Sequence, residues 1–414
     1  MFDLKFLREQ PGVIKKNNQR RKCAVDVDRL VRLDEQYRTL QSSIEDRRAQ
    51  RKLASRTKPG PEEIAAMRKL GEEIMKDEQS VTKLLDQINE LFSQLPNILA
   101  DDVPDGNDDS DNVVIKTVGE KPIFSFPPLD HMLLGERLDI IDTKHAAEVS
   151  GSRFYYLKNE AALLRLALHR WGWEKLSKEG FTLMTTPHLA RPQTLYGTGY
   201  LPFFKDDVWK LEDSELALIG TSEQTLVAYH QNETLKEHEL PKLYTATSEC
   251  FRTEAGSYGK DTKGIFRVHE FWKMEQIIVC TPETVEEYHK KALEIEEWFA
   301  QSLEIPYHIV IVCAGDCGAP GYKKYDLEAW FPSQERYREL TSNTNLTDFQ
   351  TRRLNIRYQS SAGKIAYPYT ISATALTDRF LLAIMENYQQ MDGSIRIPTV
   401  LRPYMGIDQI TQKS

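Results

Sequence analysis

Apolar residues recur at alternating spacings of three and four along the first part of the chain, and this spacing predicts a helix that packs one stripe against a partner helix. The stripe consists of Leu30, Leu33, Tyr37, Leu40 and Ile44. A second stripe runs through residues 64–95, and Pro59, Gly60 and Pro61 separate the two. We therefore expect an antiparallel helical hairpin, an arm within residues 1–100, whose helices of about thirty residues would each reach ~45 Å.

The apolar stripe of the first helix stops at Ile44, and a run of basic residues follows it. These are Arg47, Arg48, Arg51, Lys52 and Arg56. One interpretation is a solvated end of the coiled coil, and the other is a surface that contacts a phosphate backbone. A long arm that buries no core against the rest of the chain favours the second.

The pattern changes after the arm. Residues 101–119 are rich in Asp, Asn, Gly and Pro, which is typical of a linker, and residues 120–414 then alternate helical and strand-like periodicity. Helices are predicted at 144–152, 157–179, 282–303 and 376–389, and strands near 181–187, 216–219, 243–249, 277–280, 307–313, 326–332 and 338–343. The order of these strands favours an α+β domain on an antiparallel sheet. The chain has neither the GxGxxG nor the GxxxxGK[ST] pattern, so a Rossmann or P-loop nucleotide site is not expected.

Composition narrows the class of protein only slightly. A hydrophobic content of 40%, a charged content of 28% and a net charge of −8 are ordinary for a globular protein and do not indicate a nucleic-acid binder by themselves. The five cysteines form no CxxC pair, so reduced thiols are expected rather than a structural zinc. No signal-like start and no run near the ~18 apolar residues of a membrane span is found, so we expect a cytoplasmic protein without a membrane partner.

The densest candidate chemistry lies in residues 250–275, CFRTEAGSYGKDTKGIFRVHEFWKME, between two strand-like runs. Arg252 and Arg267 can hold phosphate oxygens, and Glu254 can accept a hydrogen bond from an amine. Phe271 and Trp272 offer faces for a base, at ~1–3 kcal/mol per stacked base, and Glu275 can hold an ammonium group. The alternative is a solvated hairpin whose arginines pair with neighbouring glutamates. Upstream, Thr221, Ser222 and Glu223 lie where a strand runs into a helix N-terminus with unpaired N–H groups.

These segments resemble those of one family. FRTEAGSYGKDTKGIFRVHEFWKME resembles motif 2 of class II aminoacyl-tRNA synthetases in the form found in seryl-tRNA synthetases. GFTLMTTPHL resembles motif 1, GTSE the serine-binding element, and TDRFLLAIMENYQQMDGSIRIPTVLRPYMG motif 3. KKYDLEAWFPSQERYRELTSNTNLTDFQTRR is similar to the segment that leads into the ATP and metal site, and MFDLKFLRE to the opening of the family. The resemblance covers essentially the whole chain.

The resemblance implies a class II antiparallel sheet flanked by helices, a homodimer joined partly through motif 1, and an N-terminal arm that binds tRNA. The implied ATP-binding residues are Arg252, Thr253, Glu254, Val268, Phe271, Glu339, Leu340, Thr341, Ser342 and Arg379, of which Arg252, Glu254 and Arg379 serve catalysis. The implied serine-binding residues are Thr221, Ser222, Glu223, Arg252, Glu275 and Thr374. Glu339 and Ser342 would hold Mg²⁺, and the basic residues of the arm would contact tRNA.

The implied reaction is activation of L-serine with ATP and transfer to tRNA(Ser), with tRNA(Sec) as a further candidate acceptor. Two alternatives remain open: a ligase that loads another carrier, which a full-length arm disfavours, and a non-catalytic paralogue, which the presence of Arg252 and Arg379 disfavours. The chain departs from the family in motif 3, where Ser372 stands in place of the usual Asn and Thr374 in place of the usual Ser.

Overall fold

The computed structural model describes residues 3–54, 60–255 and 264–412, and the chain divides into two compact units, residues 2–98 and 99–414. Each unit is described in its own right below.

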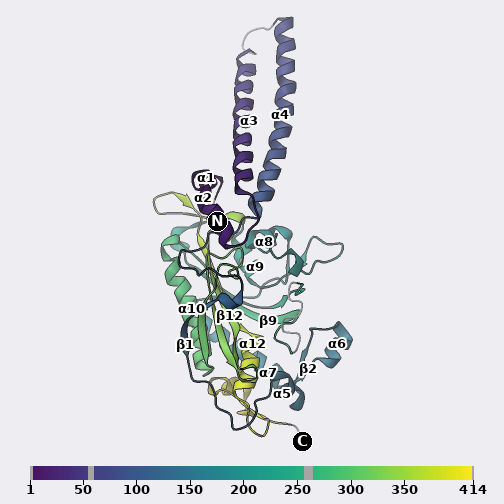
Figure 1. Cartoon of the computed structure of the whole chain (residues 1–414), viewed down its shortest axis with the longest axis vertical. Helices are drawn as coiled ribbons and strands as arrows, with labels where there is room; N and C mark the ends of the chain where they lie inside the picture. The colour runs from purple at the N-terminus through teal and green to yellow at the C-terminus, as the bar shows by residue number, and fades with distance from the viewer. Residues whose placement is uncertain (1–2, 55–59, 256–263, 413–414) are drawn as a thin grey trace. The chain divides into compact units, whose positions relative to one another are not determined.

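The first unit is helical. The helices are α1 (Leu4–Glu9), α2 (Pro11–Arg20), α3 (Val27–Ala54) and α4 (Pro61–Ser93). The two long helices α3 and α4 lie side by side along their length (Figure 1), which confirms the predicted hairpin. Leu30, Leu33 and Ile44 of the predicted stripe are buried. At the base of the hairpin, Leu7 and Ile14 of the short helices join the same core as Leu30 and Ile88.

The second unit is built on an eight-stranded sheet in the order β1-β10-β11-β12-β15-β9-β8-β4. In that order the strands are Val113–Val118, Tyr307–Ile311, Lys323–Phe331, Arg336–Thr347, Tyr369–Thr377, Glu270–Cys280, Lys242–Phe251 and Thr182–Met184. Every neighbouring pair is antiparallel except β4 and β8. The α+β prediction on an antiparallel sheet is therefore confirmed, as is the predicted antiparallel pair on either side of residues 252–269.

Shorter elements surround this sheet. The helices are α5 (His131–Arg137), α6 (Lys144–Ser150), α7 (Asn159–Lys178), α8 (Pro192–Thr198), α9 (Glu223–Val227), α10 (Val285–Ser302), α11 (Phe349–Arg353), α12 (Asp378–Asn387) and α13 (Arg402–Met405). The minor strands are β2 (Ile141–Asp142), β3 (Tyr156–Leu157), β5 (Leu189–Ala190), β6 (Ala217–Leu218), β7 (Thr234–Lys236), β13 (Arg357–Gln359), β14 (Ile365–Ala366), β16 (Ile395–Arg396) and β17 (Gln409–Ile410). No helix in the described part of the chain combines the length and the apolar character that crossing a bilayer requires.

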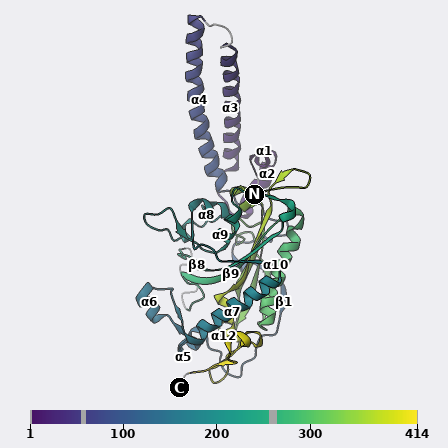
Figure 2. The same cartoon turned by 180° about the vertical axis from the view of Figure 1, so that it is seen from behind.

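Helices α7 and α10 cover one face of the sheet, and Figure 2 shows α7 lying across it. Side chains of β9 alternate between the two faces, as a pleated strand requires. On the covered face, Trp272 stacks on His169 of α7 with ring centroids 3.5 Å apart, and Gln276 donates to the carbonyl of Ala292 in α10. Phe271, Lys273 and Glu275 therefore project from the opposite face.

Two elements differ from the sequence prediction. Strand β1 lies inside the segment 101–119 that was predicted to be a linker, and it pairs with β10 at the edge of the sheet. The acidic, Gly- and Pro-containing start of that segment concealed the β-branched run VVIKTV. The helix predicted at 376–389, with Thr377 and Asp378 at its start, is α12 with Thr377 as its N-cap, but the strand before it was not predicted. That strand, β15 (Tyr369–Thr377), is buried on both faces and so has no period-two pattern.

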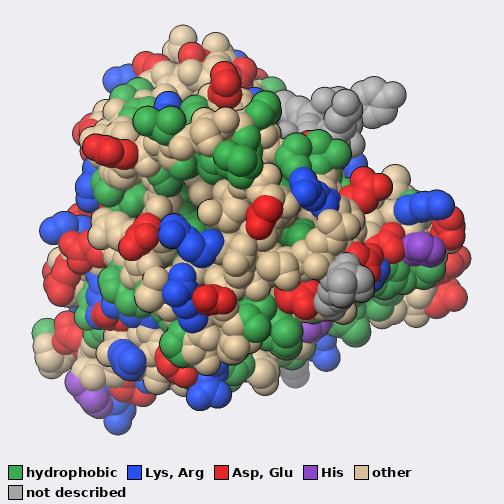
Figure 3. Space-filling model, turned by 90° about the horizontal axis from the view of Figure 1, so that it is seen from below, with side chains coloured by type: hydrophobic (Ala, Val, Ile, Leu, Met, Phe, Trp, Pro, Cys, Tyr) green, Lys and Arg blue, Asp and Glu red, His purple; other side chains and the backbone are tan. Residues whose placement is uncertain are grey.

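Charge on the surface is mixed. On the face shown in Figure 3, acidic and basic side chains are interspersed with hydrophobic ones. This distribution agrees with the modest net charge and places no single-sign patch on that face.

Candidate active site

A cavity of about 430 Å³ opens on the face of the sheet that α7 and α10 leave uncovered. Nine of the ten residues predicted to bind ATP line it: Arg252, Glu254, Val268, Phe271, Glu339, Leu340, Thr341, Ser342 and Arg379. The tenth, Thr253, lies beside it, where its N–H donates to the carbonyl of Asp207 (3.1 Å) and its hydroxyl to that of Asp206 (2.5 Å). Tertiary structure thus gathers residues that are up to 127 positions apart in sequence.

A second cavity of about 320 Å³ shares Arg252, Lys273, Ser342 and Thr374 with the first, so the two adjoin. It also contains Glu223 and Ser372. The residues common to both walls include three cations, Arg252, Lys273 and Lys324, and one acid, Asp316. An anionic group at the junction of the two cavities would lie against these positive charges.

A β-bulge brings the two predicted magnesium residues to one face. The pairing of β11 with β12 matches Leu327 with Thr341 but Glu328 with Glu339, so Leu340 is the extra residue. Without the bulge, Glu339 and Ser342 would project from opposite faces of a regular strand, because their spacing is odd. With it, both line the same cavity.

Arg379 and Glu339 form an ion pair at one end of the first cavity. Arg379 Nη1 donates to the Glu339 carbonyl (2.8 Å) and to its carboxylate Oε2 (3.1 Å). Burial opposes the charge on Glu339, but Arg379 and Lys324 hold the pKa of this carboxyl at about 2. Arg338 and Arg379 both form cation–π contacts with the ring of Phe266, and their guanidinium carbons lie 3.9 and 4.7 Å from its centroid.

The other end of the cavity holds Arg252, Phe271 and Glu254. The guanidinium of Arg252 lies 5.1 Å from the ring centroid of Phe271, and its Nε donates to the carbonyl of Gly220 (3.3 Å). Arg267 Nη1 donates to Glu254 Oε2 (2.6 Å). For this pair, the structure therefore shows the contact between an arginine and a neighbouring glutamate that the alternative to a binding role predicted. Trp272 does not reach the cavity, because strand alternation turns it to the covered face; the stacking role considered for it was wrong.

An acidic pocket lies beside the second cavity. The hydroxyl of Thr221 donates to Glu275, whose carboxylate also forms an ion pair with Lys273. Thr374 stands directly opposite Glu275 across the β15–β9 pair, where side chains of facing residues are neighbours. The Ser222 hydroxyl instead points to the carbonyl of Ala246 (3.5 Å), away from the two lined cavities.

Glu223 is the second acid of this pocket. Its Oε1 accepts from Gln350 Nε2 (2.7 Å). The Gln350 amide also donates to the Thr198 carbonyl (3.1 Å) and accepts from the Thr370 hydroxyl (2.8 Å), so its orientation is set by three partners. Burial and the nearby charge of Glu275 raise the pKa of Glu223. The positive charge of a bound cation would oppose both effects by favouring the ionised carboxylate.

Sequence reasoning assigned no role to Lys273, Gln350 or Phe266. Lys273 had a readable signal, since Phe271, Lys273 and Glu275 alternate along one face of a strand. Gln350 lies far from Glu223 in sequence and on a short helix, α11, so no local pattern connects them. Phe266 resembles any core aromatic in sequence, and only the contacts of its ring distinguish it.

The basic residues predicted to contact tRNA differ in their contacts with the neighbouring helix of the arm. Arg47 forms an ion pair with Asp77 of α4, and Arg48 Nη2 bonds Glu78 Oε1 (2.6 Å). Arg51 and Lys52 are exposed near the end of α3, and Arg56 lies outside the described residues. The contacts with α4 therefore partly neutralise Arg47 and Arg48.

Comparison with known proteins places these features in context. Residues 1–99 match the model of the seryl-tRNA synthetase N-terminal domain, and residues 206–388 match the class II tRNA synthetase core domain (G, H, P, S and T). The chain is 44% identical to a serine–tRNA ligase of Dictyoglomus turgidum, covering 100% of both chains, and 42% identical to that of Thermobifida fusca, covering 99% and 98%.

Solved structures agree with this. The crystal structure of a seryl-tRNA synthetase from Pyrococcus horikoshii complexed with ATP superposes with a TM-score of 0.96 at 39% identity, covering 100% of both chains. The cytoplasmic serine–tRNA ligase of Naegleria fowleri in complex with AMP gives a TM-score of 0.91 at 31% identity, covering 100% and 99%.

Proposed function

The chain belongs to the seryl-tRNA synthetase family, and we propose that it activates L-serine with ATP and transfers the serine to the 3′ end of tRNA(Ser). The observation that carries the proposal is the pair of adjoining cavities. One has arginines at both ends and suits a nucleotide. The other is lined by Glu223, and Glu275 lies directly behind its wall, in contact with the lining residue Lys273 and opposite Thr374, so this acidic end suits a small cationic amine.

Within these cavities, the residues supply position and charge rather than a covalent nucleophile. Arg252 and Lys273 lie at the junction, where the serine carboxylate attacks the α-phosphorus of ATP and pyrophosphate leaves. Their positive charges stabilise the carboxylate and the charge that develops on the phosphoryl oxygens. Arg379 holds the terminal phosphate at the far end, and Phe271 stacks on adenine while Glu254 accepts from its amine.

The serine pocket discriminates by hydrogen bonding. Glu275 and Thr221 would bind the ammonium group, and Glu223 with Thr374 would meet the hydroxyl. A site whose buried polar groups need a substrate hydroxyl rejects an analogue that lacks it by a larger factor than a methylene difference allows. The methyl of Thr374, where the family usually has Ser, narrows this pocket, and Ser372 supports Glu223 in place of the usual Asn.

Mg²⁺ is the expected metal, and the residues present fit it. Glu339 stays ionised because its pKa lies at about 2, and Ser342 adds a hydroxyl oxygen in the same cavity. Hard oxygen donors of this kind, completed by substrate phosphates and water, are the usual magnesium environment. Glu339 and Ser342 would hold the ion, which supplies neutralisation of phosphate charge when bound. Since the described residues contain no cluster of three or more potential ligands, the ATP phosphates would complete the shell.

The arm would bind tRNA through its basic residues, which are Arg47, Arg48, Arg51, Lys52 and Arg56. In this proposal tRNA(Sec) is a further candidate acceptor beside tRNA(Ser). We further place the protein in the cytoplasm as a homodimer. Exposed apolar residues support the dimer: Leu163 and Leu166 on α7 are 50% and 60% exposed, and Leu183 on the edge strand β4 is 40% exposed. Apolar residues beside an open sheet edge favour a subunit interface.

Pyrophosphate exchange with serine and with threonine, followed by charging of tRNA(Ser), tests the function. We expect exchange with serine and charging of the tRNA. Exchange without charging would contradict the synthetase assignment, and no exchange with any amino acid would favour the paralogue. Deleting residues 30–95 should abolish charging and spare exchange; if charging survives, the arm does not bind the tRNA. Leu166→Asp should shift the sedimentation coefficient from dimer to monomer, whereas Leu53→Asp on the arm should leave it unchanged.

A further inference from the structure

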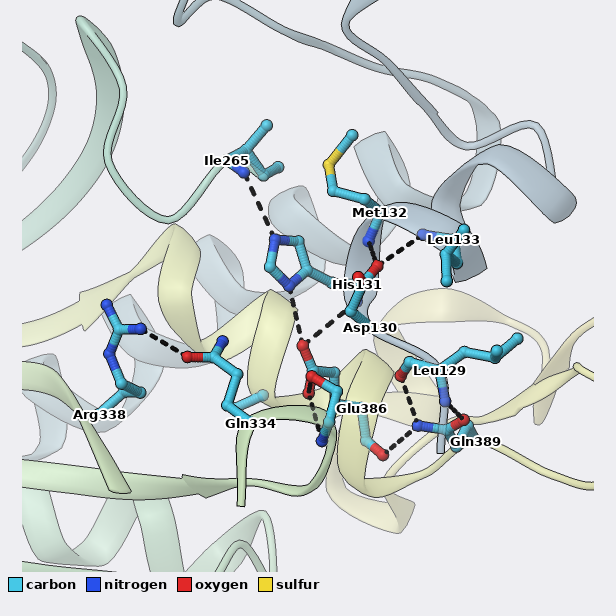
Figure 4. A network of polar contacts seen from close by, with 12 residues as sticks. Leu129, Asp130, His131, Met132, Leu133, Ile265, Gln334, Arg338, Glu386 and Gln389 are labelled. Atoms are coloured by element: carbon cyan, nitrogen blue, oxygen red, sulfur yellow. Dashed lines mark hydrogen bonds and ion pairs between the residues drawn. The ribbon is translucent and has the colours of Figure 1, made fainter. Parts of the chain in front are cut away.

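A buried carboxylate at the C-terminal end of α12 is hydrogen-bonded by residues of two other segments, one of which, at His131, is drawn in Figure 4. Glu386 is fully buried, and its Oε1 accepts from the ring Nδ1 of His131 (2.8 Å) and from the His131 backbone N–H (3.2 Å). Its Oε2 accepts from the hydroxyl (2.7 Å) and the N–H (3.3 Å) of Ser333, in the turn between β11 and β12. Such a satisfied network fixes the orientation of the His131 ring.

The other ring nitrogen of His131, Nε2, forms a hydrogen bond with the backbone of Ile265. Because Nδ1 donates to the carboxylate, Nε2 carries a lone pair and accepts from the Ile265 N–H (3.4 Å). Gly264 has φ +80°, and a Cβ at that position would lie 2.6 Å from Nε2. Both the conformation and the close approach require glycine. The ring of His131 therefore bridges α12 to residues 264–268, here called the loop stem.

The loop stem forms a wall of the nucleotide cavity. Ile265, Phe266, Arg267 and Val268 all line it. Phe266 packs against Arg379, and Arg267 hydrogen-bonds Glu254. Arg379 and Glu386 are seven residues apart on α12, two turns along the same face. One helix therefore holds the loop stem at two points, through Phe266 at its first turn and through His131 at its last.

We propose that His131 is a positioning residue for ATP. It touches no group that we assign to the substrates, and it acts through Ile265 by fixing the loop stem against α12, which sets the places of Phe266 and the Arg267–Glu254 pair. The inference rests on the proposed function, because it assigns the cavity to ATP. The serine pocket draws on β9, β15 and residues 221–223, so positioning by His131 acts on the nucleotide and not on the amino acid.

Two substitutions of similar volume separate the hydrogen bond from packing. His131→Leu fills the space but cannot accept from Ile265, whereas His131→Gln keeps an acceptor there. Binding of Mg·ATP is measured by titration calorimetry without serine or tRNA. We expect His131→Leu to weaken binding about tenfold, the scale of one lost hydrogen bond, with His131→Gln closer to wild type. In pyrophosphate exchange, KM for ATP should rise in the same order and KM for serine should stay the same.

Ser333→Ala provides the matched control, because it removes a hydrogen bond from the same carboxylate without touching the loop stem. It should lower thermal stability as His131→Leu does and leave ATP binding unchanged. Equal ATP binding by the Leu and Gln variants, or an equal rise of both KM values, would overturn the proposal. Because binding is measured without catalysis, that outcome is distinct from absence of exchange in the wild-type protein, which would overturn the proposed function instead.

A double-mutant cycle gives a second, independent test. Gly264→Ala places a methyl against His131 Nε2, so its effect on ATP binding should be larger in the wild-type background than in a His131→Ala background, where the space is vacated. Additive effects would mean that the two residues do not act on one another, contrary to the proposal.

Discussion

Lys273 offers the sharpest test of the site, because it was found only in the structure. Its ammonium group pairs with Glu275, and the two side chains are 12% and 1% exposed. Replacing Lys273 with Met keeps the length of the side chain and leaves the Glu275 carboxylate buried without its cation. Breaking a buried ion pair by removing one partner costs about 3–5 kcal/mol of unfolding free energy, since the remaining charge is uncompensated.

The expected loss is large enough to measure by thermal unfolding. At about 2 °C per kcal/mol for a large domain, the apparent melting temperature of Lys273→Met should fall by about 6–10 °C. Lys158→Met is the control, because Lys158 pairs with Asp139 at the surface, where the two side chains are 36% and 71% exposed. Loss of a pair of that kind costs less than about 1 kcal/mol, so the control should melt within about 2 °C of wild type.

A second substitution locates the cause in the unpaired carboxylate. Glu275→Gln in the Lys273→Met background removes the second buried charge, so the double variant should be more stable than Lys273→Met alone. A Lys273→Met protein as stable as wild type, or a double variant less stable than the single, would refute the reasoning.

Three other predictions test the remaining parts of the site and fold. Arg379→Gln should raise KM for ATP in pyrophosphate exchange about 10- to 100-fold, the range of a lost charge-assisted hydrogen bond, and leave KM for serine within about twofold; equal changes in both would contradict the phosphate-clamp assignment. Gln350→Leu removes the donor to Glu223 and should raise KM for serine by about tenfold or more with KM for ATP unchanged; an unchanged serine KM would exclude Glu223 from the pocket. Burial, helped by the charge of Arg165, lowers the pKa of His169 to about 3, so the folded state keeps this ring neutral while the unfolded chain takes up a proton below about pH 6.5. The contribution of His169 to stability is therefore complete above about pH 6.5, and it is lost at about 1.4 kcal/mol per pH unit as the pH falls. In urea unfolding at pH 7 and pH 5, the unfolding free energy of His169→Phe should fall less than that of wild type, by about 1.4 kcal/mol for each pH unit below about 6.5. An equal fall in both proteins would mean that the ring is protonated in the folded state.

Much of the architecture was predictable from local pattern. The arm helices could be placed because heptad spacing and a Pro–Gly–Pro break are sufficient to define them, and α10 because its apolar stripe is long. Strand β15 was missed because it lacks such a periodic pattern. TISATALT is buried on both faces, so its apolar and polar residues need not alternate. Strand β1 was missed because acidic, Gly- and Pro-containing residues precede it, and because VVIKTV, almost wholly exposed at the sheet edge, has no alternation of apolar and polar residues.

The site divides in the same way. Residue type and motif predicted a role for Arg252, Glu254, Glu339 and Arg379, which line one cavity, because charge and hydrogen-bonding capacity are properties of the side chain itself. Geometry was not available from the sequence. The Leu340 bulge turns Glu339 to the face of Ser342, and strand alternation removes Trp272 from the cavity that Phe271 enters. No local pattern records a bulge, since it depends on the pairing of two strands.

The sequence by itself therefore determined the chemical groups, the helical arm and the family of this protein. Only the tertiary structure decided which groups meet: Lys273 with Glu275, Gln350 with Glu223, and His131 with both Glu386 and Ile265. The last of these contacts joins segments that are 255 and 134 residues apart. The physical reason is that sequence patterns report forces acting within a few residues, namely period and propensity, whereas a buried charge finds its partner through the packing of the whole sheet and its helices.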